Sequence, residues 1–92
     1  MHLEYGFVFD LEQEKLFREN KEIALSANAK KLLALLCSQA NSSVLNEQIQ
    51  QHIWSEMKNS ATLRTQIHRV RTHLGEDIIH NVNGVGYMVK TI

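Results

Sequence analysis

The sequence predicts a small α+β domain, in which an antiparallel sheet over residues 3–25 precedes three helices over residues 26–75 and a β-hairpin over residues 78–91. Three patterns predict this class. Apolar residues alternate near the N-terminus, recur at helical spacing in the middle, and alternate again around an Asn-Gly pair near the C-terminus. Because 92 residues suffice for only one core, residues 1–92 are expected to form a single domain.

Composition argues against a membrane protein and against a disulfide-stabilised one. Hydrophobic residues make up 43% of the chain and charged residues 22%, which is typical of a soluble globular domain. The longest apolar stretch, residues 32–37, is far too short to span a bilayer. Cys37 is alone in an apolar helical run, so we expect a buried, inert thiol. These features predict a cytoplasmic protein without membrane contact.

The first 25 residues predict three short strands. Residues 3–9 alternate between apolar and polar side chains, and residues 15–18 and 23–25 follow as two further candidates. Asn20, in the connection between them, can take a positive φ. This segment is rich in acids, and its acidic surface is either a solvated face or a docking surface for a partner.

Two helices follow the strands. Ser26 is expected to cap the first helix, which runs to about Gln39. Its apolar side is formed by Ala29, Leu32, Leu33, Leu36 and Ala40. Asn46 is expected to cap the second helix. There, apolar side chains recur at Ile49, Ile53 and Met57, with Trp54 beside them.

The third helix has two faces of opposite character. Ser60 is expected to cap it, and Gly75 to end it in a left-handed conformation. One narrow apolar stripe consists of Leu63, Ile67, Val70 and Leu74. From residue 57 to residue 73 the only formal charges belong to Lys58, Arg64, Arg69 and Arg71. Such an acid-free polar face suits a polyanion, which makes this helix a candidate for DNA recognition.

A β-hairpin is predicted directly after the third helix. Asn83-Gly84 is a strong signal for a two-residue turn between strands over 78–82 and 85–89. Gly86 indicates a bulge or a close backbone approach. Helix, short polar turn, helix with a basic face, and hairpin together predict a winged helix-turn-helix.

The chain resembles the winged-helix DNA-binding domain of OmpR/PhoB-type response regulators, the output module of bacterial two-component systems. The marks that carry the resemblance are Leu25-Ser26 followed by KLLALL, Ile53-Trp54, TLRTQIHRVRTHLG from Thr62 to Gly75, and NGVGY from Asn83 to Tyr87. The resemblance covers essentially the whole chain. It implies a four-stranded N-terminal sheet, the third helix in the major groove and the wing in the adjacent minor groove. Membrane-anchored one-component regulators resembling ToxR have a similar domain, so the chain would be a fragment of either kind of regulator.

The same resemblance implies which residues meet DNA, and the helical wheel selects nearly the same set. The groove-facing positions of the third helix would be Thr62, Arg64, Thr65, Gln66, His68 and Arg69. Arg69, near the centre of the polar face, is the first candidate to bind guanine. The threonines could meet a thymine methyl or a phosphate, and Gln66 could pair with adenine or be a plain surface residue.

The remaining candidates are expected at the DNA backbone. Arg64, Arg71 and Lys58 suit phosphates better than bases, and His68 could donate to phosphate as a neutral ring. Trp54 is either an apolar anchor beneath the second helix or an indole donor to the backbone.

The wing departs from the family pattern. Asn83 stands where the family often has an arginine, so a short-range amide contact is expected there.

The sequence predicts no enzyme, no cofactor and no metal site. The five histidines include no pair at i, i+4, and the glycines at 84 and 86 lack a following helix that could bind phosphate. The expected partners are double-stranded DNA and a second copy on an adjacent half-site. The resemblance adds RNA polymerase, contacted through the segment between Trp54 and Thr62, and a regulatory domain outside this chain. A winged helix used only for protein contacts is the alternative, because the formal net charge is zero and the wing lacks arginine.

Overall fold

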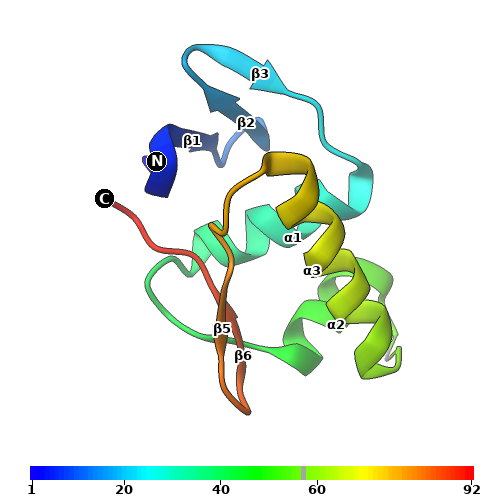
Figure 1. Cartoon of the computed structure of the whole chain (residues 1–92). Helices are drawn as coiled ribbons and strands as arrows, with labels where there is room; N and C mark the ends of the chain where they lie inside the picture. Colours follow the sequence, from blue (N-terminus) through cyan, green and yellow to red (C-terminus); the bar gives the residue numbers. More distant parts are fainter. Residues whose placement is uncertain (57) are drawn as a thin grey trace.

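The computed structural model describes residues 1–56 and 58–92. There are three helices in this part of the chain, α1 (Ala27–Ser38), α2 (Asn46–Trp54) and α3 (Ser60–Leu74), and α1 packs against both of the others. A sheet of N-terminal strands lies at one end of the helices, and a C-terminal hairpin runs beside α3 at the other (Figure 1). This arrangement confirms the predicted α+β winged-helix fold.

The N-terminal sheet contains β1 (Phe7–Asp10), β2 (Lys15–Arg18) and β3 (Lys21–Ile23), antiparallel and in that spatial order. Only Glu19 and Asn20 connect β2 to β3, with φ values of 53° and 63°. Two consecutive positive φ values are typical of the type I′ turn, so the positive φ predicted for Asn20 is confirmed. Since this tight turn pairs Lys21 with Arg18, the third strand begins before the predicted residues 23–25.

The predicted strand over residues 3–9 is wrong in its first half. Glu4–Gly6 form a short 3₁₀ helix, η1, in which Tyr5 takes a φ of 59° and is 50% exposed. This turn folds the N-terminus back over β1, where the Leu3 amide donates to the Phe7 carbonyl oxygen at 2.8 Å. Residues 2 and 3 make only isolated bridges, so the described residues give a three-stranded sheet instead of four strands.

The caps of the helices follow the prediction in one case of three. The Ser26 hydroxyl oxygen accepts a hydrogen bond from the Ala29 amide at 3.1 Å, which confirms the predicted cap of α1. Asn46 does not cap α2, because it is the first helical residue and Leu45 precedes it without a side-chain cap. The reason is that residues 44 and 45 are held in a strand up to the start of the helix.

The connection between α2 and α3 also differs from the prediction. Ser55, in the left-handed region at a φ of 58°, ends α2 after Trp54. Asn59 caps α3 in place of Ser60, since its Oδ1 accepts from the Thr62 amide at 3.0 Å and Ser60 is the first helical residue. Met57, predicted on the apolar side of the second helix, lies outside the described residues.

A second sheet joins the hairpin to the helices. It consists of β4 (Val44–Leu45), β5 (His80–Val82) and β6 (Gly86–Met88), in the order β4-β6-β5. Strand β4 was not predicted. Its pairing with β6 requires the close approach expected at Gly86, where a Cβ would lie 1.9 Å from the Val44 carbonyl oxygen.

The hairpin tip has three residues, so the predicted two-residue Asn-Gly turn is wrong. Val82 pairs with Gly86, and the Val85 amide donates to the Val82 carbonyl oxygen at 2.9 Å. Gly84 takes a φ of 73°, whereas Asn83 has no positive φ. Because β4 fixes Gly86 from the other side, the register of β6 is decided by tertiary pairing as well as by the turn.

A buried apolar cluster connects these elements. The predicted stripe of α3 is buried at all four positions, and Gly75 ends the helix at a φ of 76°. The interior also holds Cys37, which is 1% exposed, as predicted for an inert thiol. Burial raises the pKa of this thiol to about 12, because a thiolate would lose its hydration there.

Candidate nucleic-acid interface

The solvent-facing side of α3 is the best candidate for a nucleic-acid interface. Since the apolar stripe is held in the core, the opposite side is left in water, with Arg64, Thr65, His68 and Arg69 all exposed. Thr62, in the first turn, is half-buried beside the cap. Five of the six predicted groove-facing residues therefore have contact with solvent.

The electrostatic character of this side is positive. The sequence of α3 contains Arg64, Arg69 and Arg71 and no acidic residue. The His68 ring lies against the next turn, with its Nε2 3.5 Å from the Thr72 hydroxyl. The face thus offers guanidinium and hydroxyl donors without a carboxylate on its own helix to repel a phosphate.

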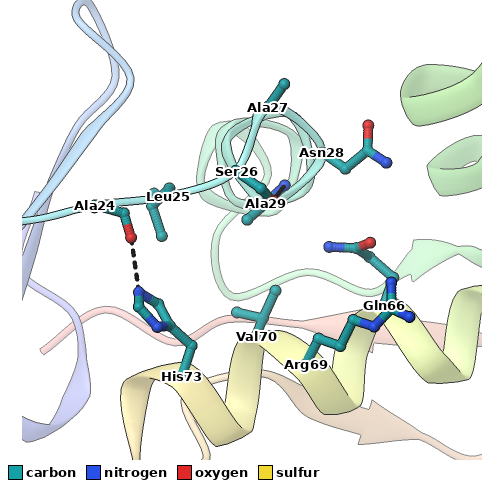
Figure 2. A pocket seen from close by; sticks show the side chains of 10 residues that line it. All are labelled: Ala24, Leu25, Ser26, Ala27, Asn28, Ala29, Gln66, Arg69, Val70 and His73. Carbon is teal, nitrogen blue, oxygen red and sulfur yellow. Dashed lines mark hydrogen bonds between the residues drawn. The ribbon is translucent and has the colours of Figure 1, made fainter.

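Gln66 is placed differently from the prediction. Its side chain is only 8% exposed and rises from α3 toward the start of α1 (Figure 2). It lies next to Ile67, at the edge of the buried stripe, and the adjoining α1 covers this edge. The helical wheel places Gln66 beside the polar face of α3. The wheel does not include α1, whose packing leaves Gln66 mostly buried.

Arg71, predicted near phosphate, is engaged within the domain. Its Nε donates to the Ile79 carbonyl oxygen at 3.2 Å, and its terminal nitrogen donates to the Asn81 Oδ1 at 2.8 Å. Asp77 lies 3.9 Å from the same guanidinium. Since these acceptors engage its Nε and one of its terminal nitrogens, Arg71 joins α3 to the chain entering β5, and its contact with phosphate stays a prediction.

Lys58 lies in the segment between α2 and α3. Its ammonium nitrogen is 2.5 Å from the Glu56 carboxylate, and this contact lowers the pKa of Glu56 through a hydrogen bond and charge attraction. The Lys58 amide donates to the Gln50 Oε1 at 2.7 Å. Gln50, 4% exposed, was not among the predicted site residues. A glutamine on a helix is usually exposed, so its residue type did not indicate that its amide is buried.

Trp54 packs against the core while remaining partly exposed, which agrees with its interpretation as an apolar anchor. It also borders a shallow groove of about 380 Å³ beside the first turns of α3. The other residues lining this groove are Asn28, Asn59, Ala61, Thr62, Thr65, Gln66 and Arg69.

The hairpin supplies the other edge of the interface. Asn83 is exposed at its tip. A groove of about 370 Å³ separates the hairpin from the helices, and Arg64 and Asn83 both line it. Glu47, from the first turn of α2, lines it as well. The structure thus brings a cation of α3 and an amide of the wing to one concave surface.

Two classes of site can be assessed over the described ranges. Residues 1–56 and 58–92 contain no group of three or more His, Cys, Asp or Glu side chains that could hold a metal ion. None of the helices in those ranges combines the length and the apolar character that crossing a bilayer requires.

Comparison with known sequences identifies relatives among regulatory proteins. Residues 20–89 match the family described as transcriptional regulatory protein, C terminal. The chain is 30% identical over 89 residues to the transcriptional regulatory protein QseB of Haemophilus influenzae, and 28% identical over 86 residues to PmrA of Pectobacterium parmentieri. These alignments cover 95% and 91% of the chain, but only 40% and 39% of the relatives.

Solved structures share the fold. The DNA-binding domain of the response regulator AdeR, in complex with an intercistronic region, matches with a TM-score of 0.79 at 18% identity, covering 99% of this chain and 100% of that one. DrrB of Thermotoga maritima, an OmpR/PhoB homologue, matches at 0.78 and 23%, covering 92% and 42%. The C-terminal domain of the nisin resistance regulator NsrR matches at 0.70 and 28%, covering 96% and 95%.

The match to the family extends from the end of the N-terminal sheet through α3 to the last strand of the hairpin, and so includes the whole candidate interface. The chain therefore belongs to the family described as transcriptional regulatory protein, C terminal.

Proposed function

We propose that this domain binds double-stranded DNA as the output domain of a bacterial transcriptional regulator, with α3 in the major groove and the β5–β6 hairpin at the adjacent minor groove. The observation that carries the proposal is the exposed, acid-free side of α3, flanked by the hairpin. A basic helix of this kind fits the major groove, and phosphate charge supplies most of the affinity.

The exposed residues take different roles in this proposal. Arg69 reads a base, because a guanidinium can donate two hydrogen bonds to guanine. Thr62 and Thr65 contact a thymine methyl or a phosphate, and Arg64, Lys58 and His68 contact phosphates. Asn83 approaches the minor groove. Gln66, which is 8% exposed and extends toward α1, is given no base contact in this proposal.

The partners of the whole protein belong to the same proposal. A single module of this size buries roughly 600–1,000 Å² on DNA, which limits its specificity, so two copies are proposed to occupy adjacent half-sites. From the family we propose a cytoplasmic location, contact with RNA polymerase through the segment between α2 and α3, and control by a regulatory domain elsewhere in the protein.

The test begins with selection of bound duplexes from a random pool, which returns both the preferred bases and the half-site spacing. The affinity for the selected duplex is then measured over a range of salt concentrations. Three exposed cations, Lys58, Arg64 and Arg69, predict a slope of log K against log salt of about −3 per copy.

A pair of charge reversals serves as the control. Arg64→Glu is expected to weaken binding strongly, whereas Lys21→Glu, on exposed β3, is expected to leave it close to the wild-type value. Absence of any duplex complex at low salt would contradict the proposal and favour a winged helix that docks to proteins.

A further inference from the structure

A second concave surface lies on the other flank of α3. This surface, termed here the α1–α3 groove, has a volume of about 760 Å³ and runs between the start of α1 and the middle of α3 (Figure 2). Its polar residues are Ser26 and Asn28 on one side and Gln66, Arg69 and His73 on the other. No carboxylate lines it within the parts of the chain that the structure describes.

Gln66 indicates that this groove takes a polar ligand. Its side chain is 8% exposed and extends across the groove toward α1 (Figure 2). Among the side chains that the structure describes, and among the backbone groups of residues 1–56 and 58–92, its amide has no hydrogen-bond partner. The amide atoms are not among the fully buried ones, so a ligand entering the groove can reach them and accept a hydrogen bond from the amide nitrogen.

The start of α1 determines the charge of that ligand. The first amides of a helix have no acceptor within the helix, and together they carry a partial positive charge. The Ser26 side chain satisfies only the Ala29 amide, which leaves the amides of Ala27 and Asn28 to other acceptors. Because Arg69 adds a full positive charge at the edge of the same groove, an anion is favoured there.

The position of the α1–α3 groove on α3 identifies the source of the anion. Arg64 lines the groove on the hairpin side, whereas Gln66, about 200° further round the helix, lines the groove on the α1 side. A helix in the major groove lies between two phosphate backbones. A concave, cation-bearing surface on each flank of α3 matches that arrangement.

We propose that the α1–α3 groove binds a backbone phosphate of the DNA recognised by α3, on the strand opposite the one near the hairpin. Asn28, the Gln66 amide and the start of α1 donate to the phosphate, and Arg69 contributes charge whether or not it also reaches a base. The His73 Nε2 donates to the Ala24 carbonyl oxygen at 2.7 Å and thereby closes one end of the groove. This inference rests on the proposed DNA binding.

Asn28→Asp is the most direct test. The substitution keeps the shape of the side chain, and an acid in the first turn stabilises a helix, so folding is preserved while the groove gains a negative charge. The matched control is Asn20→Asp, which makes the same charge change in the β2–β3 turn at a left-handed position that Asp tolerates. Gln66→Met removes the amide at similar volume.

Duplex affinity is measured by fluorescence anisotropy across salt concentrations. We expect Asn28→Asp to weaken all duplexes alike by about tenfold and to make the salt slope less negative by about one. Gln66→Met is expected to weaken binding severalfold, and Asn20→Asp to change it less than twofold. If Asn28→Asp matched Asn20→Asp while wild type bound DNA normally, the inference would be wrong and the proposed function would stand.

A titration with inorganic phosphate at constant ionic strength separates the backbone from a free anion. Amide resonances of residues 27, 28 and 66 report occupancy of the groove. Saturation by inorganic phosphate, together with unchanged duplex binding by Asn28→Asp, would assign the groove to a free anion and overturn the inference. Failure of the wild-type protein to bind any duplex would remove both the proposed function and this inference.

Discussion

The Nε of Arg71, in the last turn of α3, donates a hydrogen bond to the main-chain carbonyl oxygen of Ile79 at 3.2 Å. Ile79 directly precedes β5, and Asn81 within β5 accepts a second hydrogen bond from the same guanidinium. The side chain that the helical wheel assigns to the edge of the DNA face therefore connects the third helix to the wing.

Replacing Arg71 is expected mainly to lower the stability of the domain. Its effect on the salt dependence of DNA binding should be small. Arg71→Ala should reduce the free energy of unfolding by about 1–3 kcal/mol, because the Ile79 carbonyl oxygen loses its donor. Urea denaturation measures this loss, and exposed Arg64→Ala should stay within about 0.5 kcal/mol of wild type. A fully stable Arg71→Ala variant with a weaker salt slope would show that Arg71 acts mainly as a phosphate contact.

Gly86 is expected to tolerate no side chain. In Gly86→Ala the new methyl group would lie 1.9 Å from the Val44 carbonyl oxygen, so β4 and β6 would have to separate. We expect a loss of about 1–3 kcal/mol or more in the free energy of unfolding. Gly75→Ala is the comparison, because its Cβ meets nothing within 4 Å and it carries only the strain of a positive φ, about 1–2 kcal/mol. Equal losses of unfolding free energy for the two variants would show that β4 can move away from the new methyl group at little cost.

Cys37 predicts a loss of stability in alkaline solution. Burial raises the pKa of its thiol from 9.0 to about 12, so the folded protein holds this proton more tightly than the unfolded chain does. The resulting stabilisation is complete below pH 9.0 and is lost as the pH rises toward 12. The free energy of unfolding, measured from pH 8 to 11, should fall by about 1.4 kcal/mol per pH unit above pH 9.0. Cys37→Ala should lack this component, and a parallel decline in both proteins would contradict it.

Arg69 and Lys58 are expected to affect DNA binding in different ways. Arg69→Ala should cost about 1–3 kcal/mol at one base position and relax the preference there, because a base contact discriminates between sequences. Lys58→Ala should weaken all duplexes alike, because a phosphate contact does not. Affinities for a panel of single-base variants of the selected site measure both effects. Uniform losses for Arg69→Ala would remove it from base reading and leave it as a phosphate contact.

Local signals in the sequence were sufficient for several features of this fold. Four features depend only on residues that are close together in the sequence. They are the apolar stripe of α3, the Ser26 cap, the left-handed Gly75 and the positive φ of Asn20. Short-range sterics and hydrogen bonding decide such features, so the order of residues is enough to predict them.

Other features depend on contacts between distant segments. Strand β4 forms because β6 pairs with it, and residues 4–6 leave the strand pattern because the N-terminus turns back over β1. The caps of α2 and α3 each lie one residue before the predicted one, since β4 runs up to the start of α2 and the Asn59 side chain caps α3. Propensity at one position cannot predict the pairing of β4, because its partners Gly86 and Tyr87 lie 41 and 43 residues further along the chain.

The sequence by itself determined the fold class, the cationic third helix and the residues facing solvent at Arg64, Thr65, His68 and Arg69, because helical periodicity separates a buried stripe from its opposite side. Only the tertiary structure decided the edges of that helix. There α1 covers Gln66 and the chain entering β5 engages Arg71, since a residue at the boundary between two faces is assigned by whichever element packs beside it.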